Sequence, residues 1–117
     1  MSELEQQLNM YRTIQKEIGK VQSSISSAGT QILENEMVLK ELELLEEESS
    51  VYKLIGPVLI KQELVEVKNN VNKRIEYIKN DIGRLEQNIK NYEKQQEGVR
   101  EKINALQKAA AAAAGGK

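Results

Sequence analysis

The sequence has no cysteine and no histidine among its 117 residues. Without cysteine, neither a disulfide framework nor a thiolate zinc site can form. The absence of both residue types also removes the most common general base and the thiol nucleophile of enzymes. The glycines are scattered and form no phosphate-binding loop. We therefore expect no catalytic, cofactor-binding or metal-binding residues, and a protein that is not an enzyme.

Phenylalanine and tryptophan are also absent, and aromatic residues make up only 3% of the chain. Compact cores usually rely on aromatic side chains for buried area. Here 30% of residues are charged, which is typical of long helices with a narrow apolar seam. The net charge of -1 argues against a nucleic-acid partner, which needs a basic face. No run approaches the ~20 apolar residues of a membrane span, so no membrane partner is expected.

The single proline, Pro57, lies near the middle of the chain, and apolar residues recur every seven positions on both sides of it. Heptads sustained over about six repeats predict a coiled-coil helix in each half. Before Pro57 the seam consists of Leu4, Gln7, Tyr11, Ile14, Ile18, Val21, Ile25, Ala28, Ile32, Asn35, Leu39 and Leu42. After Pro57 it consists of Leu64, Lys68, Val71, Ile75, Ile78, Ile82, Leu85, Ile89, Tyr92, Gln96, Val99, Ile103 and Leu106.

The two halves are nearly equal in length and their connector is short, which favours an antiparallel two-helix coiled coil. In that arrangement each seam residue faces one from the other half. The predicted facing pairs are Leu39 with Val71, Ile32 with Ile78, Ala28 with Ile82, Ile25 with Leu85, Val21 with Ile89, Ile18 with Tyr92, Ile14 with Gln96, Tyr11 with Val99, Gln7 with Ile103 and Leu4 with Leu106. The alternative register slips by one heptad toward the C-terminus.

The segment around Pro57 interrupts the heptads. Val51–Ile55 and Val58–Lys61 are rich in residues favoured in strands, and Gly56 with Pro57 between them fits a turn. The sequence therefore predicts a mostly α fold with one β-hairpin, organised as a single domain over residues 1–117. The predicted ranges are 1–48 for the first coiled-coil helix, 51–61 for the hairpin, 63–108 for the second helix and 109–117 for a flexible tail.

The predicted hairpin has apolar residues on both faces. They are Val51, Tyr52, Leu54, Ile55, Val58, Leu59 and Ile60. A lone two-stranded hairpin is marginal in water, and its outer edges are unpaired. The two helices use their seams on each other and can cover little of it. We therefore expect oligomerisation through these residues, in a sheet or barrel shared between chains. The alternative is a tight loop whose apolar residues tuck against the helix ends.

The run from Val51 to Leu64, VYKLIGPVLIKQEL, is followed by Lys73-Arg74 and Tyr77-Ile78. These residues resemble the central segment of eukaryotic β-type prefoldin subunits, which have one hairpin where the α type has two. The resemblance covers most of the chain in architecture. It implies a heterohexamer of α-type and β-type subunits whose hairpins assemble into an intersubunit β-barrel.

The same resemblance implies a function. The coiled-coil tips of prefoldin hold non-native proteins such as actin and tubulin, which pass to the group II cytosolic chaperonin without ATP. The implied partners are therefore other prefoldin subunits, that chaperonin and unfolded clients, and the implied location is the cytoplasm. The alternative function, from another class, is a structural coiled-coil adaptor or tether with no client-holding activity.

In such a coil the free tips contain residues near both termini. The candidate client-binding residues are Leu4, Leu8, Met10, Tyr11, Val99, Ile103 and Leu106. Polar Gln7 and Gln96 in the seam are expected to loosen packing there, and Met10 is flexible enough to fit varied partners. The alternative is an ordinary seam with fraying ends.

Two further polar residues, Asn35 and Lys68, occupy seam positions and are predicted to fix the register, although Lys68 can also extend to solvent. The acidic stretch within residues 41–48 is typical of a solvated helix end; the alternative is contact with a basic partner surface. Ala109–Ala114 offers little to bury, so we expect it to fray.

Overall fold

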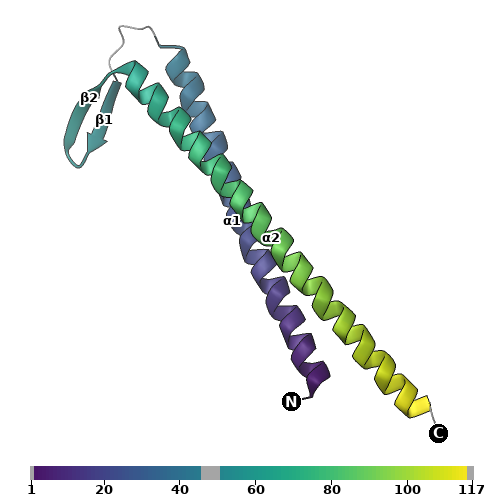
Figure 1. The fold of residues 1–117 in the computed structure, drawn as a ribbon. Coiled ribbons are helices and arrows are strands. Elements are labelled where there is room, and N and C mark those ends of the chain that lie inside the picture. The colour runs from purple at the N-terminus through teal and green to yellow at the C-terminus, as the bar shows by residue number, and fades with distance from the viewer. Residues whose placement is uncertain (1, 46–50, 116–117) are drawn as a thin grey trace. The chain divides into compact units, whose positions relative to one another are not determined.

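The computed structural model describes residues 2–45 and 51–115. Along the chain it contains helix α1 (Glu3–Glu43), strands β1 (Val51–Ile55) and β2 (Val58–Gln62), and helix α2 (Leu64–Gly115) (Figure 1). This confirms the mostly α fold of two long helices with one hairpin. Over the described stretches, neither helix is long and apolar enough to cross a membrane.

The start of α1 is fixed by a capping serine. The backbone N–H of Glu5 donates to Ser2 Oγ at 3.1 Å, and that of Gln6 donates to the Ser2 carbonyl at 3.0 Å. A serine followed three residues later by glutamate is a common helix-start signal. Glu3 and Glu5 in the first turn also place negative charge at the positive end of the helix dipole.

The predicted end of the first helix, residue 48, is wrong. Helix α1 ends at Glu43, and the N–H groups of Leu44 and Leu45 bond three residues back, to Glu41 and Leu42, at 3.2 Å. Tightened turns of this kind are common at helix ends. Carboxylates near the negative end of the helix dipole disfavour further turns, and the sequence is acidic here. Residues 46–48 of the predicted helix lie outside the described residues.

The second helix extends beyond its predicted end at residue 108, into the segment predicted as a flexible tail. Helix α2 runs on through the alanines to Gly115, with these side chains exposed. Alanine has the highest helix propensity, and nothing in the run breaks the helix. Propensity therefore extends the helix where there is nothing to bury. The last two residues of the predicted tail lie outside the described residues.

The chain divides into two compact units. Unit 1 combines Met1–Ile25 with Arg84–Lys117, and unit 2 is Ser26–Gly83. The core of unit 1 contains Ile14, Ile18, Val99 and Ile103, whereas that of unit 2 contains Leu42, Leu64, Val71 and Ile75. In each unit a segment of α1 therefore packs against a segment of α2 along the predicted seam.

All of the predicted seam positions are buried or half-buried, which confirms the heptad assignment. The register is indicated by a hydrogen bond of 2.6 Å from Gln96 Nε2 to Gln15 Oε1. Gln15 is adjacent to Ile14, the residue predicted to face Gln96. A slip of one heptad would move these side chains about 10 Å apart along the helices. The contact therefore favours the predicted register.

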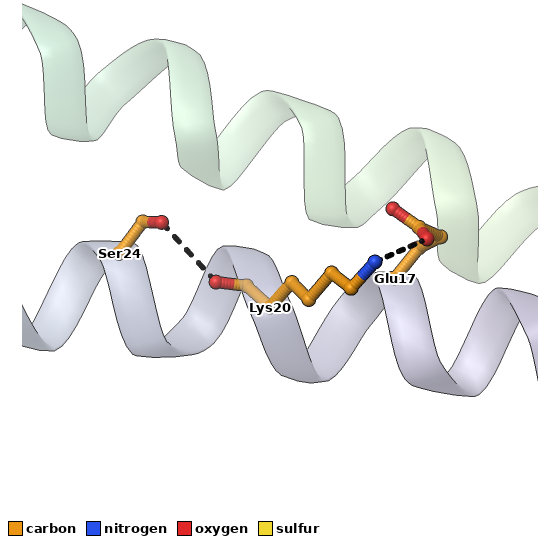
Figure 2. A network of polar contacts seen from close by, with 3 residues as sticks. All are labelled: Glu17, Lys20 and Ser24. Carbon is orange, nitrogen blue, oxygen red and sulfur yellow. Dashed lines mark hydrogen bonds and ion pairs between the residues drawn. The ribbon is translucent and has the colours of Figure 1, made fainter.

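Some polar contacts join residues within α1. Lys20 Nζ lies 3.2 Å from Glu17 Oε1, and Ser24 Oγ donates to the Lys20 carbonyl at 3.2 Å (Figure 2). Both contacts join residues of the same helix. Exposed pairs of this type contribute only about 0.3–0.5 kcal/mol. The pairing of α1 with α2 in each unit therefore depends chiefly on the apolar seam.

The seam generates a stability prediction. Ile75 is 8% exposed in the core of unit 2, whereas Tyr77, two residues later on α2, is 66% exposed. We expect Ile75→Ala to lower the free energy of unfolding by about 2–4 kcal/mol, because it removes buried methyl groups and leaves a cavity. Tyr77→Ala should change it by about 0.5 kcal/mol or less. Urea titration followed by circular dichroism, at one protein concentration, measures both; equal losses would contradict the seam assignment.

Candidate functional site

Strands β1 and β2 pair antiparallel, with Ile55 opposite Val58 and Val51 opposite Gln62. The two-residue turn between them has Gly56 at a φ of 58°, which glycine adopts without strain. The next residue is Pro57, whose ring holds φ near about −65°. This combination of φ values matches a type II′ turn, whose twist suits a hairpin. We call Val51–Gln62 the assembly hairpin.

Neither face of the assembly hairpin is covered. Alternation places Tyr52, Leu54 and Leu59 on one face and Ile55, Val58 and Ile60 on the other. These six side chains are between 43% and 67% exposed. Val51 differs, because it is half-buried and packs against the core of unit 2. The alternative in which the apolar residues tuck against the helix ends therefore applies to Val51 alone.

The hairpin also has open edges. Its sheet consists of two strands in the described part of the chain, so each strand has one side without a partner strand (Figure 1). Along such an edge the unpaired N–H and C=O groups form a template for another strand. Apolar side chains on both faces would be buried if strands were added. The geometry is suited to completing a sheet with other chains.

The candidate tip residues gather in unit 1, but most of them are packed. Val99 and Ile103 are 7% and 8% exposed, and Leu4, Leu8 and Tyr11 pack against their cluster. Leu106 is half-buried. Met10 is the exception, with 51% of its surface exposed. Their role in client binding stays a prediction, and the structure adds that all of them except Met10 are packed or half-buried.

Beside Met10 lies an open groove of about 380 Å³. Ile14 and Val99 are among its lining residues, together with Gln95 and Lys102. Gly98 also lines it, and beyond the adjacent residues and the local helix backbone no atom lies within 4 Å of the position that its Cβ would occupy. A side chain at position 98 would enter this space. The heptad pattern did not identify the groove, because it marks Gly98 only as a residue outside the seam.

The two glutamines in the unit 1 seam differ in their hydrogen bonding. Gln96 donates to Gln15, as described above, whereas Gln7 Oε1 is buried and has no hydrogen-bond partner among the described residues. An unsatisfied buried polar atom costs about 1–3 kcal/mol. This cost falls on the seam at the end of unit 1 that contains the start of α1, so the observation supports the expectation that Gln7 loosens packing there. For Gln96 the weakening is partly offset by its bond.

The remaining polar candidates have local roles. Asn35 Nδ2 donates to the Gln31 carbonyl of its own helix at 2.7 Å, and Lys68 is half-buried. The register role predicted for both stays a prediction. Within residues 2–45 and 51–115, no three acidic side chains are grouped so that they could hold a metal ion. The last part of the acidic stretch, residues 46–48, lies outside the described residues.

Paired helices with an exposed, open-edged hairpin have the architecture expected of a subunit in a larger assembly. Comparison with known proteins specifies the class further. A family model described as "Prefoldin subunit" matches residues 5–110, and the chain belongs to this family. Prefoldin subunits are components of a chaperone, and membership makes other prefoldin subunits the partners of this chain.

Individual relatives agree with the family model. The chain is 50% identical to Prefoldin subunit 6 of Arabidopsis thaliana over 105 residues, which cover 90% of this chain and 81% of that protein. It is 40% identical to Prefoldin subunit 6 of Mus musculus, covering 89% and 82% of the two chains. The crystal structure of the prefoldin beta subunit from Thermococcus strain KS-1 superposes with a TM-score of 0.80 at 18% identity, over 91% of this chain and 93% of that one. The last comparison shows the fold.

The buried amide of Gln7 gives the second prediction. Gln7→Leu removes the unsatisfied oxygen and fills the same space with an apolar side chain. We expect it to raise the free energy of unfolding by about 1–3 kcal/mol. Gln6→Leu, one position away and exposed, is the matched control and should change stability little. Chemical unfolding of both variants checks this, and equal gains would show that the effect is unrelated to the seam.

Proposed function

We propose that this chain is a β-type subunit of the heterohexameric prefoldin co-chaperone in the cytoplasm. In this role it holds non-native proteins such as actin and tubulin at the coiled-coil tips. It delivers them to the group II cytosolic chaperonin without using ATP. The observation that carries the proposal is the assembly hairpin, in which six apolar side chains are at least 43% exposed beside two open edges.

Assembly follows from the physical needs of this hairpin. Two strands alone are marginally stable in water, whereas three or more strands with a buried apolar face are independently stable. Strands from other subunits would pair with both edges and bury Leu54, Leu59 and their neighbours. Burial of apolar area stabilises by roughly 25 cal/mol per Å². Closure of the added strands into a barrel would leave no edge exposed. The hairpin residues Val51, Tyr52, Leu54, Ile55, Val58, Leu59 and Ile60 form this interface.

Client holding is assigned to the end of unit 1 that contains the candidate tip residues. Exposed Met10 beside the groove offers a flexible apolar contact that tolerates varied partners. The unsatisfied Gln7 lowers the cost of separating the helices there. Separation would expose Val99 and Ile103 to an unfolded chain. No nucleotide is needed, because binding and release require only this opening and closing.

The alternative is a structural coiled-coil tether that assembles but holds no client. The packed state of Leu4, Tyr11, Val99 and Ile103 is the observation that favours it. A tether also needs a stable seam at its ends. The unsatisfied oxygen of Gln7 opposes such stability, so we place the client-holding function first.

The assembly role gives the third prediction. The double variant Leu54→Ser with Leu59→Ser alters two residues that face each other across the strands and are 67% and 62% exposed. The variant should keep the helical content of the native chain but should not co-purify with co-expressed prefoldin subunits, because the apolar face has been removed. Lys53→Ser with Lys61→Ser, on the same strands, should assemble normally. A normal hexamer yield from the double leucine variant would refute the hairpin interface.

The tip role gives the fourth prediction. Deletion of residues 1–10 and 103–117 should leave the hexamer intact, because the assembly hairpin and the core of unit 2 are unaltered. The deletion should reduce the suppression of aggregation of unfolded actin, measured by light scattering. A hexamer whose chain lacks only residues 109–117 is the control and should suppress aggregation fully. Unchanged suppression by the larger deletion would leave the tether as the better description.

A further inference from the structure

Exposed apolar residues are distributed unevenly between the two units. Apart from Met10, the large apolar side chains that the described residues expose all lie in unit 2. They are Leu33, Met37, Val38, Leu44, Leu45, Tyr52, Leu54, Ile55, Val58, Leu59, Ile60, Val65 and Tyr77. The assembly hairpin accounts for only some of them. The remainder include a group on α1 that the proposed function does not use.

This group, which we call the outer stripe, consists of Leu33, Met37 and Leu44. They are 62%, 64% and 85% exposed. Spacings of four and seven residues place them on one face of a helix and its last turn. The seam residues Ile32 and Leu39 are half-buried, so the outer stripe lies away from the seam. A face turned away from the helix partner is normally polar, so three exposed large apolar side chains along it indicate a contact.

Carboxylates flank the outer stripe on both sides. At 3.6 residues per turn, Glu34 and Glu41 lie along one edge of it and Glu36 and Glu43 along the other; all except Glu36 are exposed and Glu36 is half-exposed. Lys40, the one basic residue in the stretch from 33 to 45, is exposed and lies on the stripe's own face between Met37 and Leu44. The four carboxylates therefore leave this face with a net negative charge. A partner for this face therefore needs an apolar centre with lysine or arginine at its edges, because like charges across an interface are strongly disfavoured.

The position of the outer stripe indicates where such a partner comes from. The stripe belongs to unit 2, the same compact unit as the assembly hairpin, and Leu44 precedes β1 by only seven positions in the sequence. A subunit that pairs with the hairpin is therefore held at the same compact unit that contains this face. Once two chains are held by one contact, a second contact forms at high effective concentration.

We propose that the outer stripe is a second contact between subunits, covered in the hexamer by a basic, apolar helix face of a neighbouring prefoldin subunit. This inference rests on the proposed assembly through the hairpin. A face of the required type exists in this chain: α2 exposes Tyr77 at 66%, with Lys73 and Arg74 one turn before it. When unlike faces of similarly folded subunits meet, the contacts run head to tail, which allows ring closure.

The test is the substitution Met37→Glu in the full chain, assembled with the other prefoldin subunits. The side chain is exposed, so the isolated chain should keep its helical content. The hexamer should form but dissociate at a concentration about tenfold higher than the native one, measured by mass photometry on dilution. Ser23→Glu is the matched control, because Ser23 is exposed two heptads earlier on the same helix face. It should behave as the native chain.

A second variant tests the charges. Glu34→Gln with Glu41→Gln should weaken the dependence of hexamer dissociation on salt, because ion pairs at an interface edge are screened. The inference is wrong if the Met37→Glu hexamer dissociates at the same concentration as the native hexamer. It is also wrong if the substitution only removes a copurifying protein that is not a prefoldin subunit. Either outcome leaves the proposed function intact, because assembly of the native chain into a hexamer is a separate test of that function. If hexamer dissociation of the glutamine variant depends on salt as strongly as that of the native chain, the partner face is not basic.

Discussion

Two strands that pair only with each other leave half of their edge groups without partners, and the assembly hairpin depends on this constraint being relieved by other chains. The helices offer no relief within the chain. Their seam residues face each other in each unit, and only Val51 of the hairpin packs against the core of unit 2. Leu54 and Leu59 stay more than half exposed. A chain that cannot cover the apolar faces and edges of its own hairpin is suited to being a subunit of a larger assembly.

The apolar seam explains why the hairpin is left free. A helix as long as α2, with 52 residues, gains most of its stability from packing one face. Heptads give each helix a single narrow face, so pairing of the two helices uses it fully. Hydrogen bonds such as Gln96 to Gln15 add specificity to one level of the seam. The ion pair Lys20–Glu17 lies within one helix and adds nothing to the pairing.

Most of the fold could be predicted from the sequence, because heptads and a strand-turn-strand pattern are both periodic signals. Periodicity carries no information on where a helix ends. Helix α1 ends at Glu43 because of local charge and turn geometry, while Ala109–Ala114 stays helical through propensity alone. The groove beside Gly98 was missed for a related reason, since it depends on the absence of a side chain. The outer stripe could have been predicted from the sequence, because Leu33 and Met37 are apolar at heptad positions that a two-helix coil leaves exposed to solvent.

The contrast between the units has a consequence for the proposed function. The assembly surface is already exposed in the single chain, whereas most of the candidate client surface is buried against itself. Assembly then needs no conformational change, so its affinity is not reduced by an opening cost. Client holding does carry that cost, which Gln7 lowers by leaving one buried oxygen unsatisfied. A latent client surface protects the tips from binding one another, because an apolar surface that is permanently exposed favours self-association. Under this proposal, the polar residue in the seam is what makes holding both possible and reversible.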